Sequence, residues 1–149
     1  MELSRNEKLM KYAGLLYAVM FTGAVLVFIC LPGQMFGIMN DISKALLPSL
    51  PLASDSGKFW VSLAVSMMTT ITVLSILIYT DVKKNYQMAI PLVAAKFTSS
   101  IFGLGFFLAG FFCNESGWNT LANLAILFTD FPLGVLMLVL YLMVKKELA

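Results

Sequence analysis

The sequence contains no histidine, a single arginine and few charged side chains. Histidine is the most common metal ligand and the usual proton carrier near neutral pH, and haem held by two histidines requires it. Charged residues make up 12% of the chain, against about 25% in a soluble globular domain. These absences exclude a histidine-based metal or haem site, and we expect neither a metal nor a cofactor.

Motifs that carry chemistry are also missing. The two cysteines, Cys30 and Cys113, do not form a CxxC motif, so thiol exchange of the thioredoxin kind has no support. There is no phosphate-binding loop and no nucleophile with a partner base. The net charge of +2 is too small to indicate nucleic acid as a partner. The sequence therefore names no reaction.

Long apolar runs dominate the chain, which is 60% hydrophobic with a mean hydropathy of +0.89. Four of them are long enough to cross a hydrocarbon core about 30 Å thick. They cover residues 12–31, 59–80, 88–112 and 120–144. The first exceeds the roughly 7–15 apolar residues of a signal peptide and lacks a small-residue cleavage site, so we interpret it as a retained span. We predict an all-α integral membrane protein, one domain over 1–149, with four transmembrane helices in an antiparallel bundle.

The longest connection between spans, residues 33–58, begins with a helical pattern. Its apolar side chains recur at helical spacing opposite a polar face, which favours a short amphipathic helix in the membrane interface. The alternative is an irregular loop folded over the bundle. The apolar positions are Met35, Met39, Ile42 and Leu46, and the polar ones are Asn40, Asp41 and Lys44.

Basic residues predict the orientation in the membrane. Seven of the ten lie in the N-terminal segment, the 81–85 turn and the C-terminal segment, and Lys44 and Lys58 lie in one of the other two loops. Because positive loops stay on the cytoplasmic side, we expect both termini in the cytoplasm. The expected location is a plasma membrane, of the bacterial inner-membrane kind, and the lipid bilayer is the first expected partner.

The second span is rich in hydroxyl groups. Ser62, Ser66, Thr69 and Thr70 lie close to one helical face. Small and hydroxyl residues allow membrane helices to approach closely and to hydrogen-bond across the contact. Each hydroxyl could instead bond to a carbonyl of its own helix. Taken together, the stripe predicts that this face points into the bundle.

Two ionisable residues lie inside the last two spans, Lys96 in one and Asp130 in the other. A charge in hydrocarbon costs on the order of 2.5–3.5 kcal/mol. Each side chain therefore needs a partner of opposite charge, or must reach the interface or lose its charge. At helical rise they lie about 18 Å and about 22 Å from the cytoplasmic ends of their spans, close enough to meet across a helical hairpin. We predict an inward-facing ion pair with polar neighbours on the same faces. These neighbours are Ser99, Ser100 and Asn123.

Other interpretations of these residues stay open. Lys96 could extend to the cytoplasmic interface, and Asp130 could be protonated. The pair could also form a working proton or ion site. Cys30 and Cys113 both fall at the outer ends of spans, where they are either a disulfide in an oxidising compartment or two free thiols.

Three functions are compatible with this pattern. The one we favour is a non-catalytic membrane module: an accessory or scaffold subunit, or a homo-oligomer, stabilised by an enclosed Lys96–Asp130 pair. Its partners would be other membrane subunits or further copies of itself. A small transporter or channel subunit would instead use the pair as a proton or ion site in a hydrated path. An enzyme acting on a lipid or quinone ranks last, because it would need more than one general acid or base in a lateral cleft.

Overall fold

The structure, a computed structural model, describes residues 2–53, 58–112 and 120–148, and these form helices without any strand. Four helices are long and apolar enough to cross a membrane. The all-helical expectation and the number of long apolar helices are therefore confirmed. The elements are α1 (Arg5–Cys30), α2 (Pro32–Leu46), α3 (Lys58–Thr80), the short α4 (Val82–Asn85), the 3₁₀ turn η1 (Tyr86–Met88), α5 (Ala89–Phe112) and α6 (Leu121–Leu148).

α1 begins seven residues before the predicted start of the first span, because a capping box starts the helix at Arg5. The backbone N–H of Glu7 donates to the Ser4 hydroxyl at 3.1 Å, and the Glu7 carboxylate accepts from the backbone N–H of Ser4 at 2.7 Å. These two bonds satisfy groups that a helix N-terminus otherwise leaves unpaired. The polar N-terminal segment is thus the first part of the long helix.

A single residue, Leu31, separates α1 from α2. Pro32 occupies the first turn of α2, where its missing N–H costs no helical bond. The helix predicted in this connection is therefore present and follows α1 directly. The side-chain amide of Asn40 then exchanges two 2.9 Å hydrogen bonds with the backbone of Ala53, which ties the segment after α2 back to it.

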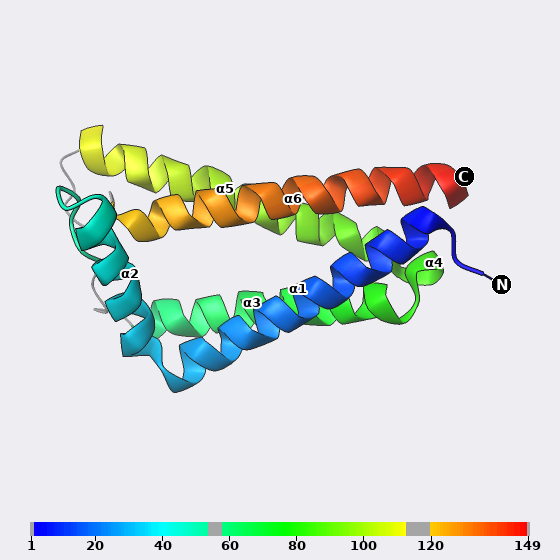
Figure 1. Cartoon of the computed structure of the whole chain (residues 1–149), viewed down its shortest axis with the longest axis horizontal. Coiled ribbons are helices and arrows are strands. Elements are labelled where there is room, and N and C mark those ends of the chain that lie inside the picture. The colour runs from blue at the N-terminus through cyan, green and yellow to red at the C-terminus, as the bar shows by residue number, and fades with distance from the viewer. Residues whose placement is uncertain (1, 54–57, 113–119, 149) are drawn as a thin grey trace.

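The long helices lie along the length of the molecule as two close pairs (Figure 1). α1 packs chiefly against α3, and α5 packs chiefly against α6. Both termini and α4 lie at one end of the molecule, which we call the terminal end. α2 lies at the opposite end, where it contacts α1 and α6.

The hydrophobic core occupies the half of the molecule near the terminal end. Its fully buried members come from the first part of α1, the last part of α3, the first part of α5 and the last part of α6. Close approach of α1 and α3 depends on Gly14, where a Cβ would lie 3.0 Å from the Ser75 carbonyl oxygen. The side chains with no exposed surface include Met10, Tyr17, Ile78, Leu92, Met137 and Val144.

The predicted inward face of α3 is wrong. Ser62, Ser66, Thr69 and Thr70 are all exposed, and α3 instead buries Ile71, Ser75 and Ile78. The hydroxyls of Thr69 and Thr70 donate to the carbonyls four residues earlier, at 2.8 and 3.0 Å. A hydroxyl satisfied within its own helix needs no partner on another one, so the stripe does not determine the packing face.

Candidate functional site

The candidate site lies where α5 meets α6, at the edge of the core. The ammonium nitrogen of Lys96 lies 2.7 Å from Oδ1 of Asp130, a distance typical of a charge-assisted hydrogen bond. The Lys96 side chain is 3% exposed and that of Asp130 is 18% exposed. The ammonium group is therefore enclosed, whereas one side of the carboxylate reaches the molecular surface.

Two serines on α5 complete the polar contacts around the pair. The Ser99 hydroxyl contacts both Oδ2 of Asp130 and the backbone carbonyl of Lys96. The Ser100 hydroxyl donates to the same carbonyl at 2.7 Å, so it supports the backbone of Lys96 rather than the carboxylate. Both oxygens of Asp130 consequently have a partner on α5, one from Lys96 and one from Ser99.

Small residues allow this close contact between α5 and α6. A Cβ on Gly134 would lie 3.1 Å from the Cβ of Lys96, and one on Gly103 would lie 2.9 Å from the backbone oxygen of Asn123. As residue numbers rise along α5, those of the facing residues fall along α6, so these two helices run in opposite directions. Asn123 thus meets α5 about two turns of helix from Asp130, with its backbone against Gly103.

α1 contributes two aromatic residues that our sequence-based prediction of the site missed. The ring centroid of Phe21 lies 3.9 Å from the ammonium nitrogen of Lys96, within the range of a cation–π contact. The hydroxyl of the fully buried Tyr17 donates to the backbone carbonyl of Leu133, one residue before Gly134. A tyrosine in the middle of an apolar run was the available signal, because its buried hydroxyl needs a partner.

The chemistry open to this arrangement is limited. It holds one carboxylate and one ammonium group, already in contact, so a proton exchanged between them is the simplest event it supports. Within the described part of the chain, no cluster of three or more histidine, cysteine, aspartate or glutamate side chains is placed to hold a metal ion. The contacts that the structure shows are the ion pair between α5 and α6 and the ring of Phe21 from α1.

A second polar cluster joins the elements at the terminal end. The buried carboxylate of Glu7, besides capping α1, lies 3.7 Å from the ammonium nitrogen of Lys83 on α4. The carboxylate of Glu147 accepts from the Ser4 hydroxyl and from the Asn6 side-chain amide. These contacts connect the start of α1 to α4 and to the end of α6.

The two alternatives for the cysteines, a disulfide or two free thiols, both stay open. Cys30 is exposed at the last residue of α1. Cys113 lies outside the residues that the structure describes.

Comparison with known proteins assigns no family to this arrangement. No protein-family model, no curated protein and no solved structure gives a significant match to the chain.

Proposed function

We propose that the chain is a non-catalytic multi-pass membrane protein, an accessory or scaffold subunit or a homo-oligomeric module. In this proposal the four long helices form an antiparallel bundle within a plasma membrane of the bacterial inner-membrane kind. The Lys96–Asp130 pair then locks α5 to α6. The observation that carries the proposal is the near-complete enclosure of the Lys96 ammonium, which has partners on two other helices, Asp130 on α6 and Phe21 on α1.

The surface of the helices supports a membrane location. Large apolar side chains are exposed along all four long helices, for example Val19, Val73, Ile101 and Phe128. In water such a surface would associate or aggregate, whereas in a bilayer it faces acyl chains at no cost. Exposed apolar residues on α2, among them Ile42 and Leu46, are in keeping with a helix lying in the interface.

The distribution of basic residues supports cytoplasmic termini. The terminal end of the molecule carries seven basic residues, from the start of α1, from α4 and from the end of α6 (Figure 1). The opposite end carries Lys44 and Lys58. By the positive-inside rule the terminal end faces the cytoplasm.

Replacing the pair with apolar residues tests the structural role. Changing Asp130 alone to leucine leaves the enclosed ammonium without its carboxylate, which is expected to destabilise the bundle by about 3–5 kcal/mol. The double variant K96M/D130L, which removes both charges, is expected to recover most of that loss. Unfolding of the detergent-solubilised chain by increasing SDS measures both. A double variant as unstable as D130L would contradict the proposal.

One observation favours a second candidate, a small transporter or channel subunit: the Asp130 carboxylate reaches the surface while its partner does not. In that case the conservative D130N variant should keep the fold but lose proton flux in liposomes. The K96M/D130L variant should likewise fold but give no proton flux. Wild-type chain that gives no proton flux above empty liposomes would leave the scaffold proposal as the better one.

A further inference from the structure

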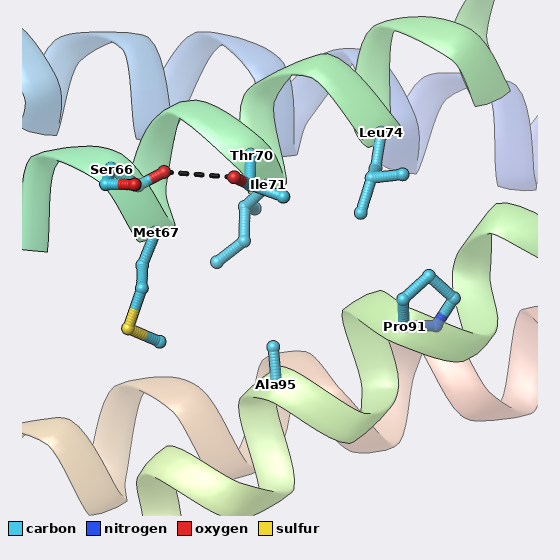
Figure 2. A pocket seen from close by; sticks show the side chains of 7 residues that line it. All are labelled: Ser66, Met67, Thr70, Ile71, Leu74, Pro91 and Ala95. Atoms are coloured by element: carbon cyan, nitrogen blue, oxygen red, sulfur yellow. Dashed lines mark hydrogen bonds between the residues drawn. The ribbon is translucent and has the colours of Figure 1, made fainter. Parts of the chain in front are cut away.

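A lateral groove lies between α3 and α5, outside the site already described (Figure 2). It is an open groove with a volume of about 260 Å³, with Met67, Ile71 and Leu74 on the α3 side and Pro91 and Ala95 on the α5 side. The groove exists because α3 and α5 contact each other far less than each contacts its main partner. In a bilayer it would open toward the acyl chains.

The walls of the groove suit hydrocarbon. The Thr70 hydroxyl faces it but donates to the Ser66 carbonyl at 3.0 Å, the dashed line in Figure 2, so it already has a partner. Pro91 has no backbone N–H to offer. The Ser66 hydroxyl also lines the groove, but the other lining side chains, apart from Thr70, are apolar. A ligand in this groove would therefore meet mostly apolar atoms, which favours an alkyl chain over a polar molecule.

The groove is small. On the α3 side its lining runs from Ser66 to Leu74, about 12 Å along the helix. Its volume of about 260 Å³ has room for part of one extended alkyl chain.

Positive charge lies at one end of the groove. α3 and α5 are joined through α4 and η1, so Lys83 and Lys84 of α4 follow the groove at its terminal end. Lys83 is close to Glu7, whereas Lys84 is exposed and forms no ion pair within the described residues. Basic residues at the cytoplasmic end of transmembrane helices attract anionic lipid headgroups.

We propose that this groove binds one acyl chain of an anionic phospholipid, with the lipid phosphate against Lys84. The inference rests on the proposed membrane location of the chain, because the groove meets lipid only there. The apolar groove accounts for the tail, and Lys84, which lies beyond its terminal end, accounts for the charge of the headgroup.

Native mass spectrometry of the full chain in mild detergent tests the proposal, with dioleoylphosphatidylglycerol as the anionic lipid and dioleoylphosphatidylcholine as the neutral one. We expect the wild-type chain to retain phosphatidylglycerol in preference. Ala95→Phe fills the groove and is expected to abolish this adduct, while Ala94→Phe, exposed and outside the groove lining, keeps it. Lys84→Gln is expected to weaken the preference about fivefold, and Lys146→Gln, a like change elsewhere at the terminal end, to leave it unaltered.

The results that overturn the proposal are specific. Equal retention of the two lipids by the wild-type chain, or equal losses in the two phenylalanine variants, would exclude the groove as the binding site. So would a disulfide-linked dimer formed through a cysteine placed at Met67, since that would put a second copy there. Extraction of the wild-type chain from membranes by alkaline carbonate would instead refute the membrane location itself.

Discussion

The ring of Phe21 lies against the ammonium group of Lys96, with 3.9 Å between the ring centroid and the nitrogen. The ammonium group thus contacts two partners, the Asp130 carboxylate and the aromatic ring of Phe21. Phe21 belongs to α1, so the polar contact between α5 and α6 also holds the first helix of the chain. This contact therefore joins the two helix pairs, together with the hydrophobic core that they share.

Phe21→Leu should weaken the bundle through loss of that aromatic face. A buried cation–π contact contributes about 0.5–2 kcal/mol, and leucine retains most of the apolar volume. The effect should disappear in a Lys96→Met background, where no cation remains. SDS unfolding of the two single variants and the double variant gives the coupling energy. Equal losses in both backgrounds would show that Phe21 acts only by its bulk.

Gly103→Ala should separate α5 from α6. The new Cβ would lie 2.9 Å from the Asn123 backbone oxygen, a group that cannot rotate away, and we expect a loss of about 1–3 kcal/mol. Gly105, on the same helix, has nothing within 4 Å of its would-be Cβ. Gly105→Ala should therefore be neutral or stabilising by up to about 1 kcal/mol. The unfolding free energies of the two variants are compared directly, and equal values would refute this account of the contact.

Tyr17→Phe removes the hydroxyl that donates to the Leu133 carbonyl between α1 and α6. Hydrogen bonds between membrane helices contribute about 0.6 kcal/mol on average and rarely exceed about 1.7, so a loss in that range is expected. Tyr12 is an exposed tyrosine on the same helix and provides the matched control. Tyr12→Phe should leave the unfolding midpoint unchanged. If both variants behave alike, the Tyr17 hydroxyl has no role in joining the helices.

Variants of Glu7 should separate its two roles. Glu7→Gln keeps a side-chain acceptor for the capping box but removes the charge facing Lys83, and a loss of about 1 kcal/mol or less is expected because Lys83 is partly exposed. Glu7→Ala removes the cap as well and should cost about 1 kcal/mol more. Thermal unfolding at low and high salt checks this. The loss in Glu7→Gln should shrink at high salt, because salt screens the charges, whereas the additional loss in Glu7→Ala should stay the same.

The sequence by itself determined the kind of elements this chain forms and, for the second and third apolar runs, where the helices start and end. Apolar runs of about 20 residues or more require helices in hydrocarbon, since every backbone group must be bonded within its own segment. α3 (Lys58–Thr80) and α5 (Ala89–Phe112) accordingly begin and end within one residue of the runs 59–80 and 88–112. The length and composition of a run are local properties, so they can be read from the sequence without knowing how the chain folds.

The faces on which these helices pack were decided only by the tertiary structure. On α3 the four residues of the hydroxyl stripe are exposed, and the hydroxyls of Thr69 and Thr70 are bonded within their own helix. Gly14, absent from any sequence pattern that we used, sets the contact with α1. The spacing of residues shows which of them share a helix face. It does not show which face packs, because the helix surface against which that face fits comes from a distant part of the chain.

In the candidate site, too, the sequence identified some residues and the tertiary structure added others. Lys96 and Asp130 stand out in the sequence because a charge within an apolar run is costly wherever the helix points. Their 2.7 Å contact, and the arrival of Phe21 and Tyr17 from α1, depend on the register between helices. That register is set where backbones can approach closely, at Gly103 and Gly134, and such a fit between two surfaces exists only once the chain has folded.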